Sequence, residues 1–224
     1  MTQARWRRVS VALGCLLAAA SPARSTPIII DFEADAVGAK VNPFVPTGVG
    51  GVMFSDSVGQ DLWVDDFGSA GSGHRCLYVG TDMDLSVLKI AFGFMADQFS
   101  LDFGNDDPAF TNPGDLAVLR LFHDAAPIGL VAVVLNRNDI MDQTISFGAI
   151  GGSARFNNVT FAYVNPFLDP ATGGGQVNVG LAEVVDNLSI DPAASASVPE
   201  PGALGLLATG LVAAASLSRR RRRG

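Results

Sequence analysis

The sequence predicts an all-β domain, an antiparallel β-sandwich, flanked by an N-terminal signal helix and a C-terminal transmembrane helix. Two observations predict the sandwich. Short apolar or alternating runs recur along residues 26–192, and Gly, Pro, Asn and Asp separate them at short intervals. No long segment has the 3.6-residue period of an amphipathic helix. We expect roughly eight to ten strands from this pattern.

The predicted strands follow one another closely along this domain. The segment 98–103, QFSLDF, alternates most cleanly, with Phe99, Leu101 and Phe103 on one face and polar residues on the other. The other predicted strands cover residues 28–30, 51–54, 85–94, 116–122, 128–135, 143–147, 155–164 and 181–190. The segment 104–115, GNDDPAFTNPGD, separates two of them and is expected to form an exposed loop without the spacing of an EF-hand.

The chain divides into five predicted parts. They are a signal peptide (1–25), the β-sandwich domain (26–192), a linker with a Pro-Glu-Pro motif (193–201), a transmembrane helix (202–218) and a basic cytoplasmic tail (219–224). The N-terminal part has three arginines, then the apolar run 9–20, then small residues that fit a cleavage site. This order is typical of a cleaved secretory signal, because the apolar run is short for a membrane span.

Export changes both the charge and the cysteine content of the protein. Residues 26–198 hold six basic residues against twenty-one acidic ones, a formal net charge of −15. A surface this acidic argues against nucleic acid or anionic lipid as a partner. Cys76 is the one cysteine left after the signal is removed, so the domain cannot form an intrachain disulfide. Its stability must come from its core or from a bound metal.

The C-terminal segment carries the most specific signal in the sequence. Residues 198–201, Val-Pro-Glu-Pro, precede a short apolar stretch and then Arg219, Arg220, Arg221, Arg222 and Arg223. Prolines disfavour helix, so Pro199, Glu200 and Pro201 are expected to form an extended stretch that an enzyme can bind. The arginines are held in the cytoplasm by the positive-inside rule.

This segment resembles a PEP-CTERM sorting signal. The resemblance covers residues 198–224 and implies a Gram-negative bacterium, recognition by an exosortase and cleavage near Pro-Glu-Pro. It also implies transient anchoring in the inner membrane, then delivery to the cell surface or the extracellular matrix. An ordinary single-pass membrane anchor is the alternative.

The ends of the domain resemble those of secreted jelly-roll modules, including carbohydrate-binding modules and MAM-like domains. The residues concerned are Asp31-Phe32-Glu33 with Gly51-Val52-Met53-Phe54 at the start, and Val184 to Ile190 at the end. In such modules the first and last strands lie side by side and hold a structural Ca²⁺. The resemblance therefore implies a jelly-roll-like sandwich with a calcium site at Glu33 and Asp186, joined by Asp31 and Asp102. The alternative is that these carboxylates are solvated strand ends.

Aromatic side chains near glycine-rich loops are the other candidates for ligand contact. Trp63 and Tyr78 have this position, and exposed rings there could stack on sugars. A buried core position is the alternative for each.

No catalytic site is predicted. The domain has two histidines and one cysteine, too few for a typical zinc site, and no Gly-x-Ser-x-Gly motif. The sequence thus predicts an exported surface or matrix protein whose sandwich binds, or builds structure, in an exopolysaccharide or biofilm setting. A secreted hydrolase that acts on polysaccharide, and a plain single-pass structural surface protein, are the alternatives.

Overall fold

The computed structural model describes residues 25–58, 61–68, 74–80, 85, 87–148, 154–166 and 179–194. These residues belong to one compact unit, residues 24–195. Almost all of the predicted signal peptide, the Pro-Glu-Pro motif, the predicted transmembrane helix and the basic tail lie outside the described residues. Among the residues that are described, there is no helix of the length and apolar character needed to cross a membrane.

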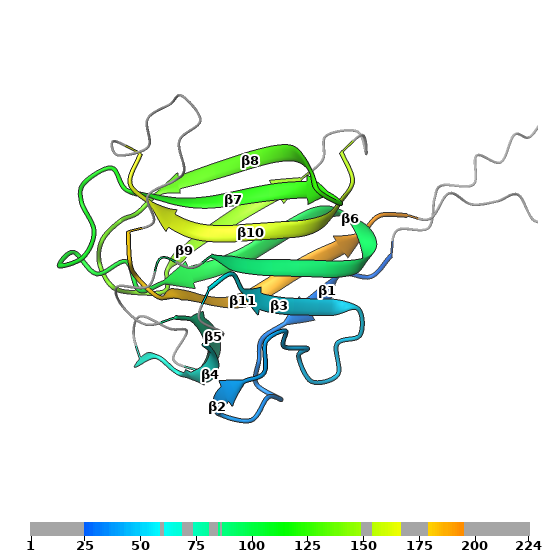
Figure 1. Cartoon of the computed structure of the whole chain (residues 1–224), viewed down its shortest axis with the longest axis horizontal. Coiled ribbons are helices and arrows are strands. Elements are labelled where there is room, and N and C mark those ends of the chain that lie inside the picture. Colours follow the sequence, from blue (N-terminus) through cyan, green and yellow to red (C-terminus); the bar gives the residue numbers. More distant parts are fainter. Residues whose placement is uncertain are drawn as a thin grey trace, which may run out of the picture. The chain divides into compact units, whose positions relative to one another are not determined.

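The described part of the chain is all-β and antiparallel, with eleven strands (Figure 1). In chain order they are β1 (Ile28–Ile30), β2 (Gly38–Lys40), β3 (Val52–Asp56), β4 (Leu62–Asp66), β5 (Arg75–Val79), β6 (Leu88–Gly104), β7 (Leu116–His123), β8 (Ala126–Val134), β9 (Gln143–Gly148), β10 (Phe156–Val164) and β11 (Glu183–Pro192). The predicted fold class is confirmed at the level of an all-β, antiparallel domain.

Strand β6 belongs to two layers of the sandwich. Its first half pairs with β3 and β10, and β10 continues through β7 to β8; we call this layer A. Its second half pairs with β9 and β11, and β11 continues through β5 and β4 to β2; we call this layer B. Figure 1 shows β6 running through both groups of strands.

The sequence pattern of β6 explains this change of layer. Leu88, Ile90 and Phe92 are buried at even positions, whereas Phe99, Leu101 and Phe103 are buried at odd positions. An extra residue must therefore be inserted between the two sets, and the pairing registers are irregular near residues 91–98. A bulge of this kind bends a strand and increases its twist. The prediction of two separate strands at 85–94 and 98–103 is wrong for this reason.

Phenylalanine side chains from both layers fill the core. Phe103 of β6 packs against Phe161 and Tyr163 of β10, with ring centroids 5.6 and 6.2 Å apart. Phe92 and Phe99, which lie on the two halves of β6, also pack against each other, with ring centroids 6.0 Å apart. Because large aromatic rings bury much apolar area, these contacts stabilise the folded domain in the absence of an intrachain disulfide.

The first and last strands lie side by side, as the jelly-roll resemblance implies. In the register of β1 and β11, Ile28 faces Ile190 and Ile30 faces Leu188. Ile30, Leu188 and Ile190 are buried in the core. The chain leaves β1 next to Asp186, so the two acidic ends of the domain meet in space.

Candidate functional site

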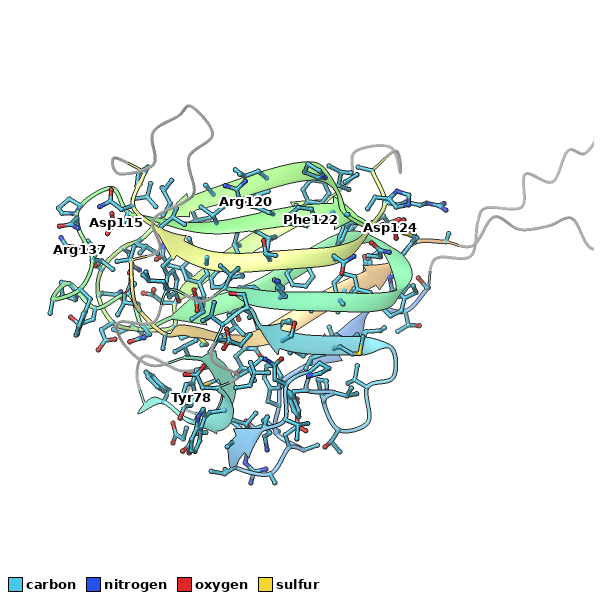
Figure 2. All side chains as sticks on the ribbon, viewed as in Figure 1. Tyr78, Asp115, Arg120, Phe122, Asp124 and Arg137 are labelled. Atoms are coloured by element: carbon cyan, nitrogen blue, oxygen red, sulfur yellow. The ribbon has the colours of Figure 1, made fainter. Side chains whose placement is uncertain are left out.

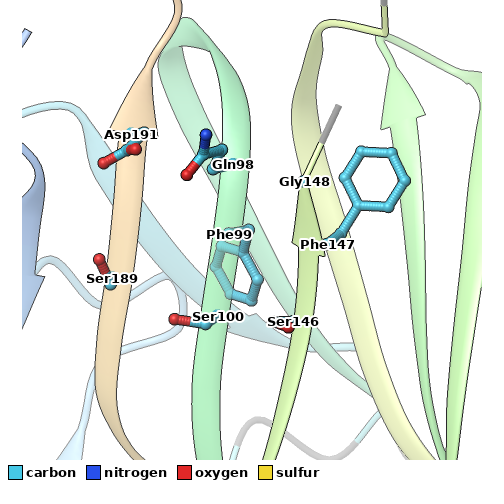
Figure 3. A pocket seen from close by; sticks show the side chains of 8 residues that line it. All are labelled: Gln98, Phe99, Ser100, Ser146, Phe147, Gly148, Ser189 and Asp191. Carbon is cyan, nitrogen blue, oxygen red and sulfur yellow. The ribbon is translucent and has the colours of Figure 1, made fainter. Parts of the chain in front are cut away.

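Three strands of layer B carry a row of hydroxyl groups on their outer face. Ser189 of β11 lies opposite Ser100 of β6, and Ser100 lies opposite Ser146 of β9. Directly opposite residues in an antiparallel pair point to the same face. The next pairs along the strands add Asp191 beside Gln98, and Gln98 beside Gly148. Figure 3 shows these side chains along the three neighbouring strands.

These side chains line a groove of about 210 Å³. We call it the serine groove and define it by Gln98, Ser100, Ser146, Gly148, Ser189 and Asp191. It follows from strict alternation, because Phe99, Leu101, Ile145, Leu188 and Ile190 between these positions are buried in the core. Three short side chains in the central row leave space above the sheet that larger residues would fill.

The three serine hydroxyls form no hydrogen bond with another protein group in the described part of the chain. A hydroxyl can donate one hydrogen bond and accept two. The row therefore presents donors and acceptors from three adjacent strands, at positions fixed by the sheet. Such a row can bind a polar chain that lies across the strands.

A second pocket brings together three of the four predicted calcium ligands. Asp31, Glu33 and Asp186 line it with His74 and Asn187, and its volume is about 400 Å³. Asp186 is only 2% exposed. The two pockets lie on the same layer, because Ser189 and Asp186 both belong to β11. We call this second one the acidic pocket.

Hydrogen bonds hold the walls of the acidic pocket. The Glu33 carboxylate accepts the backbone N–H of Arg75 at 2.9 Å, and the Arg75 guanidinium donates to the Glu33 carbonyl at 2.8 Å. Asp31 accepts the backbone N–H of Glu33 at 3.2 Å. His74 Nδ1 lies 3.9 Å from the Glu33 carboxylate. These bonds fix the chain after β1 against the start of β5.

The fourth predicted ligand, Asp102, lies beside the pocket and does not line it. It faces Asp186 across the β6–β11 pair and accepts the Thr144 hydroxyl at 2.6 Å. Its other oxygen accepts the Asn187 amide at 3.2 Å. Asn187 has a positive φ of 48° at an irregularity in the β6–β11 pairing, so its amide can reach sideways to Asp102.

The acidic pocket has the right donor chemistry for calcium, but its carboxylates do not converge. Calcium prefers six to eight oxygen ligands. Within the described ranges, no group of three or more acidic, histidine or cysteine side chains is close enough to hold a metal ion. Side chains of the pocket would have to rotate towards a common centre. The calcium site stays a prediction.

The structure places Trp63 and Tyr78 face to face on β4 and β5. Their rings are stacked, with centroids 6.3 Å apart and an interplanar angle of 10°. Phe67 contacts Tyr78 at 5.0 Å, and Trp63 remains 37% exposed. One face of the Trp63 ring is thus occupied by Tyr78. Whether this pair stacks on a ligand stays a prediction.

The lone cysteine of the domain is a buried core residue. Cys76 is fully buried in β5, and its thiol donates to the Asp65 carbonyl at 3.3 Å. Burial, the largest cause, acts together with the nearby Asp186, Asp66 and Asp65 carboxylates to raise the pKa of the Cys76 thiol to about 12. The reactive thiolate is therefore suppressed in the folded domain.

We expect Cys76 to resist a thiol-reactive disulfide reagent at about pH 8 in the folded exported protein, and to react fully after unfolding in urea. The folded thiol is both inaccessible and protonated, whereas the unfolded thiol is partly ionised at that pH. Absorbance of the released leaving group measures the reaction. Rapid labelling without urea would contradict the buried position of β5.

The segment 104–115 is a loop, as the sequence predicts, but only its middle is exposed, because both of its ends are buried. Asp106 and Asp115 are 1% and 0% exposed. The Asp106 carboxylate accepts the backbone N–H groups of Arg137, Asn138 and Asp139. Figure 2 shows Asp115 and Arg137 at the same end of the domain.

This contact fixes a loop with unusual backbone geometry. Arg137 and Asp139 have φ values of 61° and 55°. The Arg137 guanidinium donates to the carbonyls of Pro108 and Thr111, at 2.9 and 2.8 Å. No local pattern marks this contact, because Asp106 and the 137–139 loop lie about thirty residues apart in the chain and neither belongs to a recognised motif. We call this set of bonds the Asp106 clamp.

Comparison with known proteins identifies the C-terminal segment. Residues 197–223 match the PEP-CTERM protein-sorting motif. The chain therefore carries the signal of an exported protein that an exosortase processes, with transient membrane anchoring at its C-terminus. This confirms the resemblance of the C-terminal segment to a PEP-CTERM sorting signal, whereas the individual roles of Pro199, Glu200, Pro201 and the arginine block stay predictions.

The domain itself has distant similarity to solved structures. A DUF4465 family protein from Bacteroides caccae has a TM-score of 0.42 and 10% identity, covering 75% of this chain and 100% of that chain. The CBM22-2 xylan-binding domain from Paenibacillus barcinonensis Xyn10C has a TM-score of 0.36 and 12% identity, covering 74% of this chain and 98% of that chain. No curated protein matches the sequence.

Proposed function

We propose that this protein, after processing at its PEP-CTERM motif, resides at the cell surface or in the extracellular matrix and binds polysaccharide without cleaving it. The observation that carries the proposal is the row of Ser100, Ser146 and Ser189 on the outer face of layer B. Hydroxyls fixed by a sheet are suitable partners for the hydroxyls of a sugar chain. Export to the matrix would bring this face to such polymers.

The composition of the serine groove supports binding rather than hydrolysis. Glycoside hydrolysis in most enzyme families uses two carboxyl groups on either side of the bond that breaks. The serine groove has one carboxylate, Asp191, among its lining residues. A shallow polar groove across several strands is suited to holding a polymer chain.

We expect the variant S100A/S146A to bind a matrix polysaccharide about tenfold more weakly than the natural protein, because two hydrogen bonds of ordinary strength are lost. Affinity electrophoresis or titration calorimetry with the exported protein and polysaccharide from the producing strain measures this. Ser55→Ala is the matched control, since Ser55 lies on β3 of layer A. Equal binding by the double variant and the natural protein would contradict the assignment of the serine groove.

We also propose that the acidic pocket binds a structural Ca²⁺ through Glu33 and Asp186, with Asp31 and Asp102 near it. Excess Ca²⁺ is expected to raise the melting temperature relative to chelator, because a ligand that binds only the folded state stabilises it. The variant Asp31→Asn should reduce this shift, whereas Asp124→Asn on the β7–β8 turn should keep it. An identical melting temperature in Ca²⁺ and in chelator would exclude the site.

A further inference from the structure

We propose that the exported domain forms a symmetric dimer in which strand β8 pairs with β8 of a second copy of this chain. Strand β8 is the last strand of layer A, and among the described strands it pairs with β7 alone. Figure 1 shows β8 at the outer edge of this layer. An edge strand presents unpaired backbone N–H and C=O groups on its free side, and these groups can pair with a strand of another chain.

The two faces of β8 differ in how they are covered. Val131 and Val133 point inward and pack against the core. The residues between and beside them point outward: Leu130 and Val134 are 53% and 58% exposed, and Ala132 is exposed as well. The strand therefore has apolar side chains on its outer face in addition to its free edge.

The sequence of β8 lacks the features with which edge strands usually avoid pairing. Those features include charged side chains, proline and short length. Strand β2, at the end of layer B, has three residues and includes Lys40. By contrast the segment 129–135, GLVAVVL, has seven residues with no charge and no proline, and three of them are valine. Segments of this kind have a strong tendency to pair with copies of themselves.

A two-fold axis at Ala132 gives a register in which β8 is complementary to itself. In an antiparallel pair of identical strands centred on this residue, Leu130 of one copy lies opposite Val134 of the other, and Val131 lies opposite Val133. Directly opposite residues share a face of the sheet, so the two large exposed side chains cover each other. Both copies use the same residues, so the contact closes on itself and forms a dimer.

The charge of the domain favours this edge for the approach of a second copy. Residues 26–198 carry a formal net charge of −15, so two copies repel each other in most orientations. The outward residues of β7 beside β8 include Leu116, Val118 and Arg120, and Figure 2 shows Arg120 on this strand. No acidic side chain belongs to this row or to β8, whereas the outer face of layer B carries Asp102 and Asp191. Pairing through β8 thus avoids bringing carboxylates together.

Sedimentation velocity of the exported protein measures the dimer. We expect a dimer at about 100 μM and a monomer for Ala132→Lys, whose dissociation constant should be at least about a hundredfold higher, because two ammonium groups would meet at the axis. Met53→Lys is the matched control and should remain a dimer, since Met53 is 43% exposed on β3, at the opposite edge of layer A. Thermal melting of both variants verifies that they are folded.

Cysteine variants test the register. A residue on the two-fold axis of an antiparallel pair lies opposite its own copy, at a Cα separation that a disulfide can span. We therefore expect Ala132→Cys to form a disulfide-linked dimer under mild oxidation, whereas Met53→Cys should migrate as a monomer on a non-reducing gel. The natural thiol does not interfere, because Cys76 is fully buried.

The salt dependence separates an apolar strand contact from one made by opposite charges. Dimerisation should strengthen as salt rises from about 50 to about 300 mM, because salt screens the repulsion between two acidic domains. A contact between opposite charges would weaken over the same range, and that result would contradict pairing through β8.

Other outcomes would also overturn the inference. A natural protein that is monomeric at this concentration would exclude the dimer and leave the edge of β8 to a strand of a different protein. A dimer that persists in Ala132→Lys, or an Ala132→Cys variant without cross-links, would place the contact on another surface. The inference does not depend on polysaccharide binding, because the serine groove lies on layer B. The variant S100A/S146A should therefore remain a dimer even where it no longer binds polysaccharide.

Discussion

A Glu200→Ala variant is expected to remain uncut, with Arg219 to Arg223 still attached, in cells that process the natural protein to completion. Glu200 is the charged residue between the two prolines of the PEP-CTERM motif, which matches residues 197–223. Proline disfavours helix at its own position and at the preceding residue, which favours an extended backbone that a processing enzyme can bind. The variant removes the one charged side chain of the Pro-Glu-Pro motif. Intact mass spectrometry of membrane and exported fractions measures the result.

Two controls give this prediction its meaning. The natural protein in cells without an exosortase should show the same uncut mass as the variant. The second control is Asp124→Asn, which lies on an exposed turn and should be processed normally. Glu183→Ala would be unsuitable, because Glu183 is buried in β11. Removal of the arginine block from the Glu200→Ala variant at the natural rate would show that recognition does not depend on the motif.

Replacing Asp106 by alanine is expected to lower the free energy of unfolding by about 3 kcal/mol, since it leaves backbone N–H groups of the 137–139 loop without their acceptor. The carboxylate accepts N–H groups from Arg137, Asn138 and Asp139, and it is 1% exposed. Arg137 and Asp139 would also keep their left-handed φ without support. Urea unfolding followed by intrinsic fluorescence measures the loss.

Asp107→Ala is the matched control for the Asp106 clamp. Asp107 is the next residue in the chain, and its carboxylate accepts a single N–H, from Ala109 at 2.7 Å. We expect this variant to lose less than about 1 kcal/mol. Similar losses in the two variants would mean that the clamp does not stabilise the domain and that only the removal of an acidic residue matters.

Local patterns in the sequence were sufficient for the class of the fold and for the sorting signal at the C-terminus. Alternation in the segment 98–103 correctly separated the buried Phe99, Leu101 and Phe103 from the outward Gln98, Ser100 and Asp102. The sorting motif could be recognised because its residues are consecutive in the sequence. The meeting of Glu33 and Asp186 was also anticipated, through the resemblance of the two ends of the domain to jelly-roll modules.

Short strands and long-range contacts were not predictable in this way. Strands β2, β4 and β5 have three to five residues. Such short segments do not show enough alternation of apolar and polar residues to be distinguished from loops. The inserted residue in β6 interrupts the alternation of buried and exposed residues, so the sequence pattern predicts two strands where the structure has one. The Asp106 clamp depends on backbone N–H groups, and every non-proline residue has one, so no residue type marks the partner.

The sequence by itself determined the two-residue period of the strands, the acidic charge of the exported domain and the sorting signal, because each depends on neighbouring residues or on composition. Only the tertiary structure decided where function is expected. Ser100, Ser146 and Ser189 come from three distant segments and become one row only when β6, β9 and β11 pair in a particular register. The register is set by the burial of the phenylalanines and isoleucines between them. A groove of this kind is thus a property of the packed core beneath it.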